Sequence, residues 1–280
     1  MGIDVGFSSK RKTTCLCLLE WDKAGLCFRF RLVGSGDNER ADAFNDLVEH
    51  RRLAGIALDG PLTHELRLVG HYRAAEAILS RGWLQRRGKP GQTSSPTGQM
   101  LHQHATKLAR LALSSASIDP ATHWEAIHEK RIVEAFPNIF LGALIDETLL
   151  PVLSRDATDR YWELAVEKSD RLNLLMQFLL PDRRVDNDLA ACFDHEQRAG
   201  AICALSALAV VMGKHTAVGD AIDGDIVLPP AETWGVDLEG HTPWLEAILR
   251  NNVCTVRGSR KAHPNHGVAR AVTESGLWFY

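Results

Sequence analysis

Three carboxylates interrupt segments that are otherwise typical of buried strands. Asp4 lies within GIDVGFS, Asp59 ends LAGIALD, and Glu134 lies within RIVEA. Burying an ionised carboxylate is costly unless another group neutralises it. Acids that converge at one sheet edge are most simply neutralised by Mg²⁺ or Mn²⁺, and Mg²⁺ prefers oxygen ligands. These residues are therefore candidates for catalytic acids, with Asp4 and Asp59 as metal ligands.

Each carboxylate also has a structural interpretation. Asp59 begins the common turn sequence Asp-Gly-Pro. Glu134 has Lys130 and Arg131 nearby as pairing partners. Asp4 has only Gly, Ile and Val as close neighbours, so the local sequence offers no structural explanation for a carboxylate at this position.

A fourth acidic group begins the helix predicted from residue 194. Asp194 and Gln197 have the spacing of a capping box, and Asp194 and Arg198 have that of an i,i+4 ion pair. In the functional interpretation, the helix lies on the sheet and brings Asp194 or Glu196 to the strand-end acids as a catalytic group and metal ligand. Glu196 is the better ligand candidate if Asp194 caps the helix, but the spacing does not choose between them.

The segment RRGKPGQTSSPTG, residues 86–98, is basic and rich in glycine and hydroxyl groups. It does not match the P-loop pattern. It is either an ordinary surface loop or the lining of a phosphate-binding groove beside the acids, with Lys89 binding the substrate.

Composition limits the function classes. The chain has 280 residues, a formal net charge of −3 and 45% hydrophobic residues. This charge is not that of a protein that binds nucleic acid through overall basicity. The six cysteines form no CxxC pair, which is typical of reduced, packed cysteines. With no signal peptide or membrane-spanning run recognised, we expect a cytoplasmic protein without a membrane partner and leave its oligomeric state open.

Hydrophobic patterning predicts an α/β domain with a mixed sheet. The expected strands are 2–7, 13–20, 26–33, 53–59, 131–135 and 225–230. The expected helices are 42–51, 72–80, 98–113, 137–145, 158–180, 194–213 and 245–249. We expect residues 1–230 to form one domain and 231–280 to be an extension packed on it.

The ordered motifs GIDVGFS, IALDGPL, VEAFPN, EKSDRLNLL and DHEQRAGAICALSALAV resemble those of the DUF429 family of predicted nucleases. The ending GDIVLPP also resembles the segment that closes the family's domain. The resemblance covers about residues 2 to 230 and implies a ribonuclease H-like fold. That fold has a mixed five-stranded sheet flanked by helices, here with a helical insertion and the C-terminal extension.

The resemblance assigns roles to the same acids. Asp4 and Asp59 match the acids of the first and fourth strands, and Glu134 matches the glutamate of an E-x-x-P segment. Asp194 and Glu196 match the acidic start of the last helix. The implied activity is hydrolysis of DNA or RNA phosphodiesters with one or two Mg²⁺ or Mn²⁺ ions.

The resemblance also implies a contact to phosphate and includes one departure. Lys168 and Arg171 fall on a K-x-x-R segment and are expected on one helical face, where they bind substrate or are simply solvated. The family commonly has Asp-Ala where this chain has Arg198-Ala199. If that Asp is a metal ligand in relatives, catalysis here rests on Asp194 or Glu196, or is weakened.

Two other functions stay open. Sugar kinases and actin-like ATPases also begin with an Asp-x-Gly strand, but need two such domains and a late Gly-rich adenosine motif. The other alternative is a non-catalytic domain that binds nucleic acid or another partner. Tight ATP binding would favour the first, and acids that fail to converge would favour the second.

Overall fold

The computed structural model describes most of the chain. The described residues are 1–23, 25–63, 70–116, 118, 132–151, 157–181, 183–185, 189, 192, 194–258, 269–273 and 276–279.

Within these ranges the strands form one mixed ten-stranded sheet in the order β10-β9-β7-β8-β5-β4-β1-β2-β3-β6. The strands are β1 (Gly2–Asp4), β2 (Thr14–Trp21), β3 (Gly25–Val33), β4 (Ile56–Asp59), β5 (Ile132–Ala135), β6 (Arg184–Val185), β7 (Thr216–Asp220), β8 (Gly224–Leu228), β9 (Arg270–Thr273) and β10 (Gly276–Phe279). As predicted, β2 pairs antiparallel with both β1 and β3. On the other side of β1, β4 runs parallel to β1, and β5 runs parallel to β4.

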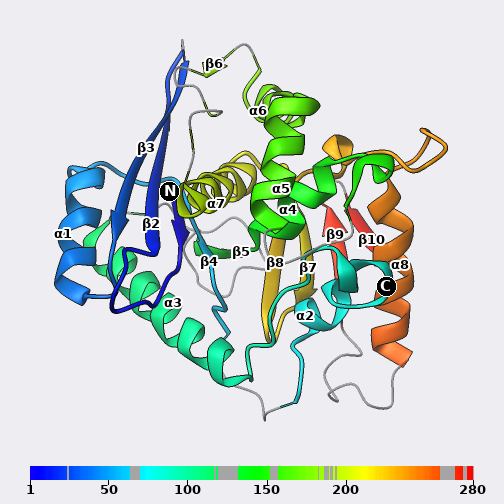
Figure 1. Cartoon of the computed structure of the whole chain (residues 1–280), viewed down its shortest axis with the longest axis horizontal. Coiled ribbons are helices and arrows are strands. Elements are labelled where there is room, and N and C mark those ends of the chain that lie inside the picture. The colour runs from blue at the N-terminus through cyan, green and yellow to red at the C-terminus, as the bar shows by residue number, and fades with distance from the viewer. Residues whose placement is uncertain are drawn as a thin grey trace.

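Helices cover both faces of this sheet (Figure 1). They are α1 (Asp37–Val48), α2 (Ala74–Leu79), α3 (Pro96–Ser115), α4 (Pro137–Leu144), α5 (Ala157–Trp162), α6 (Arg171–Leu179), α7 (His195–Val211) and α8 (Trp244–Gly258). Ile3 and Leu58 share a core with α1 and α3. Ala57 and Val133 contact Cys203 and other residues of α7 on the opposite face. Residues that face α1 and α3 therefore alternate along the strands with residues that face α7, because successive side chains of a strand point to opposite faces of the sheet.

Helix α7 packs closely on the sheet at two glycines, Gly2 of β1 and Gly200 of the helix itself. A Cβ atom on Gly2 would lie 2.1 Å from the backbone nitrogen of Ala204. A Cβ atom on Gly200 would lie 2.9 Å from Cys15 Sγ. Neither position has room for a side chain, so the glycines set the height of α7 above β1 and β2.

The α/β class is as predicted, but the sheet is larger than the expected five strands. The prediction missed β7, whose sequence TAVGD is short and contains a glycine. It also missed the two-residue strand β6, which pairs with β3, and the strands β9 and β10. The last two belong to the C-terminal extension and lengthen the same sheet, with β9 pairing to β7.

The expected helix 158–180 is divided. After α5 the chain forms a π-helical turn, Glu163–Lys168, and α6 begins at Arg171. Asp170 has a left-handed φ of 52°, and the Ser169 hydroxyl donates to the Leu164 carbonyl at 2.6 Å. Lys168 and Arg171 therefore do not share one continuous helical face, and that prediction is wrong.

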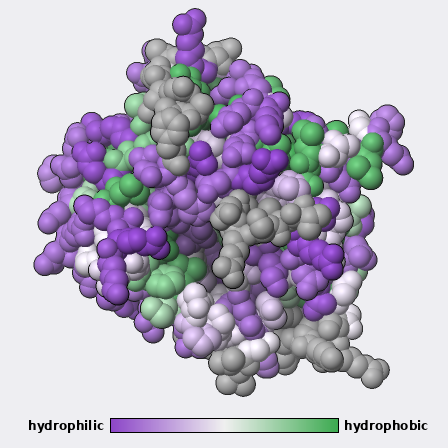
Figure 2. Space-filling model, in the orientation of Figure 1, coloured by the Kyte–Doolittle hydropathy of each residue, from purple (hydrophilic) through white to green (hydrophobic). Residues whose placement is uncertain are grey.

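No helix in the described ranges has the length and apolarity needed to cross a membrane. The face shown in Figure 2 is mainly hydrophilic, with apolar residues in small groups.

The glycine contact of α7 gives a stability prediction. Gly200→Val places new carbon atoms against Cys15, and we expect it to lower the free energy of unfolding by about 1–3 kcal/mol. Urea unfolding measures this loss. The control is Gly91→Val, because a Cβ at Gly91 meets no atom within 4 Å; equal losses in the two variants would contradict the close docking of α7.

Candidate active site

Asp4 and Asp59 are direct neighbours at the ends of two parallel strands. They are paired in the register of β1 and β4, so their side chains leave the same face of the sheet. That is the face on which α7 lies, because Gly2 and Ala57 occupy the same register two residues earlier and contact this helix. Both aspartates are half-buried.

The first turn of α7 brings a third carboxylate to this pair. Glu196, Gly200 and Cys203 lie on one face of the helix, given its 3.6-residue repeat. Residues 200–204 cover Gly2, so the helix start extends over the carboxyl end of β1. Glu196 is half-buried there, whereas Asp194 is exposed.

The charges of Asp59 and Glu196 both act on Asp4. Burial raises the pKa of Asp4 well above its usual range, and the negative charges of Asp59 and Glu196 raise it further. Burial, followed by the charge of Glu134, raises the pKa of Asp59 to about 7. Among the described residues, no side chain forms an ion pair or hydrogen bond with Asp4 or Asp59. This pair therefore lacks the positive charge that ionised carboxylates require in a partly buried position.

Asp194 does not join this cluster. It occupies the N-cap position of α7, but its side chain makes no capping hydrogen bond, so the predicted capping box is wrong. The predicted ion pair with Arg198 is also absent: Arg198 Nη1 bonds Asp159 Oδ1 at 2.9 Å, and its Nε donates to the Cys192 carbonyl. Of the two acids at the helix start, Glu196 is the one whose charge acts on Asp4, and its role as a metal ligand stays a prediction.

Glu134 is close to Asp59 but leaves the opposite face of the sheet. Its register partner on β4 is Leu58, while Asp59 pairs with Ala135. Arg73 Nη1 donates to Glu134 Oε2 at 2.8 Å, and Nη2 donates to Oε1 at 2.6 Å. The backbone N–H of Leu62 also donates to Oε2. Glu134 is therefore neutralised from within the protein, by Arg73. The expected partners, Lys130 and Arg131, fall outside the described ranges.

Arg73 joins Glu134 to a second buried acid. Its Nε donates to Glu76 Oε1 at 2.8 Å, and both side chains are almost fully buried. Thr93 contributes its backbone N–H and its hydroxyl to the same Glu76 oxygen. This network is not predicted from the sequence, although Arg73 and Glu76 have i,i+3 spacing in a segment predicted as a helix. This spacing alone does not indicate burial.

A pocket of about 140 Å³ lies at the ends of β4 and β5 and is lined by the 90–98 loop. We call it the strand-end pocket. Asp59, Glu134 and Arg73 form one side, and Thr97 at the start of α3 belongs to the loop side. The loop therefore lines a pocket beside Asp59 and Glu134, whereas phosphate binding by this loop stays a prediction. Lys89 is exposed and immediately precedes Pro90 of the lining.

The other predicted substrate-binding residues lie elsewhere. Arg171 forms an ion pair with Asp146, whose Oδ1 also accepts the Val236 N–H at 2.9 Å. Lys168 is exposed in the π-helical turn. None of the strand-end pocket's lining comes from α5, α6 or this turn.

Arg40 is a further residue that sequence reasoning missed. It is 1% exposed, and its Nη2 donates to the Gly6 carbonyl at 2.6 Å and to Thr14 Oγ1 at 2.9 Å. Its Nε donates to the Gly34 carbonyl, and its Nη1 contacts His104 Nδ1 at 3.0 Å. Arg40 thus fixes the turn that follows Asp4.

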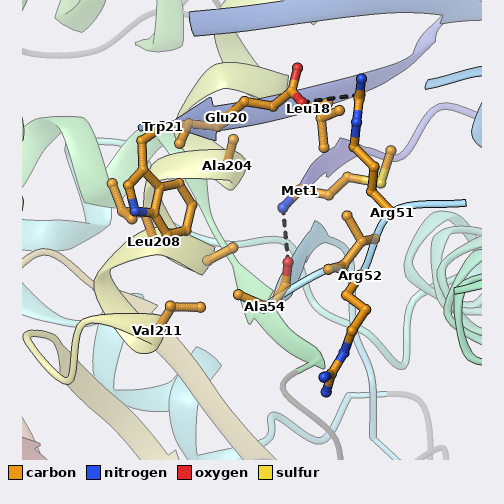
Figure 3. Close-up of a pocket in the computed structure, with 14 residues that line it drawn as sticks. Met1, Leu18, Glu20, Trp21, Arg51, Arg52, Ala54, Ala204, Leu208 and Val211 are labelled. Carbon is orange, nitrogen blue, oxygen red and sulfur yellow. Dashed lines mark hydrogen bonds and ion pairs between the residues drawn. The ribbon is translucent and has the colours of Figure 1, made fainter. Parts of the chain in front are cut away.

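A second pocket, of about 290 Å³, lies at the other end of β1 (Figure 3). Met1, Trp21 and Arg51 are among its lining residues. Arg51 forms ion pairs with Glu20 at 3.0 Å and Glu49 at 2.8 Å. This pocket contains none of the predicted site residues, and Arg51 already has acidic partners.

No protein-family model, curated protein or solved structure matches the chain. Among the described residues, no three histidine, cysteine, aspartate or glutamate side chains are grouped so as to surround a metal ion. The structure thus groups Asp4, Asp59 and Glu196 electrostatically, around a pair of adjacent aspartates rather than a closed ligand set.

The buried Arg73 network gives a second prediction. Arg73→Met leaves Glu76 and Glu134 buried without their cation, and loss of one partner of a buried pair costs about 3–5 kcal/mol of folding stability. Chemical denaturation measures this change. The control is Arg160→Met, which breaks an exposed pair with Glu163 and should cost less than about 1 kcal/mol. Similar losses would show that the Arg73 network contributes no more than a surface ion pair.

The aspartate pair gives a pH prediction. The pKa of Asp59 is about 7 in the folded protein and about 4 in an unfolded chain. The folded state therefore binds the proton more tightly between these values, and stability should fall as pH rises through this window. Asp59→Asn should flatten that fall.

Unfolding of both proteins across this pH range, in the presence of a chelator, measures the effect. Asp4 acts in the same direction, so the slope should shrink rather than vanish. Parallel pH profiles for wild type and Asp59→Asn would contradict the shifted pKa.

Proposed function

We propose that the chain is a metal-dependent phosphodiesterase of ribonuclease H-like fold that acts on nucleic acid. The observation that carries this proposal is the register of Asp4 with Asp59 on adjacent parallel strands, where no described side chain forms an ion pair with either aspartate. The sheet order around them supports it, because three antiparallel strands and a fourth strand beside the first agree with the resemblance given by the sequence motifs.

The residues fit a hard divalent cation. Mg²⁺ is usually held by one or two carboxylates together with water and substrate phosphates, rather than by a closed protein cage. Asp4 and Asp59 supply two such carboxylates, and Glu196 adds negative charge from the helix. When bound, such a cation supplies charge neutralisation and an activated water for attack on phosphorus.

The protein's own groups have separate tasks in this proposal. Asp4 and Asp59 bind the cation, and β1 and β4 hold them rigidly from the core of the sheet. Glu196, half-buried beside them, is placed to accept a proton from water. Arg40 holds the turn after Asp4, and the Arg73–Glu134 pair supports the end of β5 beside Asp59.

Calorimetric titration of Mn²⁺ into wild type and Asp4→Asn tests the proposal. We expect binding to wild type and its loss in the variant, which removes one ligand charge. Hydrolysis of labelled single-stranded DNA and RNA should also fall by at least about a hundredfold. Asp46→Asn is the control, because Asp46 is an exposed aspartate of α1 that pairs with Arg31.

Full hydrolysis by Asp4→Asn would refute the catalytic assignment. Absence of Mn²⁺ binding to wild type, both alone and with an oligonucleotide present, would favour a non-catalytic binding domain.

A further inference from the structure

A basic loop joins β1 to β2 at the end of the sheet that carries the aspartate pair. Residues 7–13 have the sequence FSSKRKT, with three cations and no acid, and we call them the basic loop. The side chains of Lys10, Arg11 and Lys12 are exposed. Because Asp4 ends β1, the six residues that lead to Lys10 can span no more than about 20 Å.

Contacts within the basic loop and with α3 order its backbone. The loop lies beside α3 (Figure 1), where Phe7 stacks on His104 with ring centroids 6.2 Å apart. Ser8 Oγ accepts hydrogen bonds from the backbone N–H groups of Lys10 and Arg11, both at 3.2 Å. The cations are thus presented by a backbone that is already ordered, which lowers the entropy cost of binding a ligand.

The cations of the basic loop differ in whether an acid neutralises them. Lys12 Nζ lies 3.2 Å from Oε1 of Glu39, in the first turn of α1. Neither Lys10 nor Arg11 forms an ion pair with any residue that the structure describes. These two side chains are therefore available to an external anion at the same end of the sheet as the aspartate pair.

The open position of these cations fits a chain of phosphates better than a single anion. Lys10 and Arg11 line neither the strand-end pocket nor the pocket of Figure 3. Solvent and salt weaken the attraction between one exposed cation and one anion. A nucleic-acid backbone meets several cations at once and releases counterions when it binds.

We propose that the basic loop binds the phosphate backbone of a nucleic acid whose strand runs on to the aspartate pair, with Lys10 and Arg11 as the contacts. This inference deepens the proposed function and rests on it for the position of the cleaved bond. Since the loop lies so near Asp4 along the chain, the bound phosphates flank that bond. Contacts to the backbone carry no sequence information, so the loop should favour no base.

Binding of a labelled oligothymidine or oligouridine in chelating buffer, followed by fluorescence anisotropy, tests the loop without cleavage. Lys10→Glu and Arg11→Glu should each weaken binding roughly tenfold. Each should also reduce the slope of log affinity against log salt concentration by about one. The matched control is Lys23→Glu, because Lys23 is exposed in the turn at the opposite end of β2. It changes the net charge equally and should cause no comparable loss.

Glu39 offers a variant that should strengthen binding. Glu39→Gln releases Lys12 and removes a negative charge beside the loop, so affinity for the oligonucleotide should rise severalfold. A glutamine oxygen can still accept the Gly34 N–H that Glu39 Oε2 accepts at 3.0 Å. The control is Glu49→Gln, which removes an exposed acid beyond the other end of α1. Equal gains in the two variants would assign the effect to net charge and overturn the role of the loop.

Asp4→Asn separates this inference from the proposed function. It should lose Mn²⁺ binding and keep oligonucleotide binding in chelating buffer, because Lys10 and Arg11 are intact. Loop-dependent binding without any hydrolysis would refute the nuclease and leave the binding surface in place.

Three results would overturn the inference itself. The first is a loss in Lys10→Glu and Arg11→Glu no larger than that in Lys23→Glu. The second is an unchanged salt dependence in both loop variants. The third is wild-type protein that binds vesicles containing anionic lipid but neither oligonucleotide, which would assign the loop to a membrane surface.

Discussion

The close contact of α7 with the first strand is the constraint on which the candidate site depends. Gly2 and Gly200 remove the side chains that would hold the helix away from the sheet. Once the helix lies this low, its start must cover the carboxyl end of β1, since helix and strand advance by fixed distances per residue. Glu196 therefore reaches the aspartate pair. The helix dipole also places partial positive charge at this end of α7, which favours carboxylates there.

The buried acids of the sheet differ in whether a nearby cation neutralises them, and this difference helps to separate structural acids from candidate functional ones. Glu134 receives a bidentate guanidinium and a backbone N–H, as expected for a carboxylate that only has to be stable. Asp225 on β8 is 4% exposed with Arg270 Nη2 at 3.9 Å, and burial followed by Asp220 and Glu134 raises its pKa well above the usual range. Asp4 and Asp59 are instead paired with each other. No described side chain supplies a cation to either, so ionising both lowers the stability of the fold, and carboxylates with such raised pKa values are typical of functional sites.

The sequence predicts the parts of this arrangement that depend on local patterning. Runs such as TCLCLLEW and the apolar IALD indicate strands, and their order indicates antiparallel pairing followed by a buried strand. The acids at the ends of β1 and β4 can also be recognised in the sequence, because each interrupts or ends such an apolar run. The cation partner of Glu134 is not predictable locally, because Arg73 is 61 residues away. The break in the helix near Ser169 and Asp170 is not predictable either. The segment LAVEKSDRLNLL has good helical periodicity, and only its packing in the folded protein selects the left-handed conformation of Asp170.

The pairing register of β4 with β5 decides which acids share a face of the sheet, which the alternation of apolar and polar residues alone does not show. Glu134 and Asp59 both occur near strand ends, and the sequence suggests that they converge on one face. A shift of one residue in the pairing of β4 with β5 is enough to place them on opposite faces. The end of β4 thus separates two environments. The aspartate pair lies under α7 on one face of the sheet, and the strand-end pocket lined by the 90–98 loop lies toward the other face. The first environment therefore surrounds two adjacent aspartates, and the second surrounds two glutamates that Arg73 neutralises.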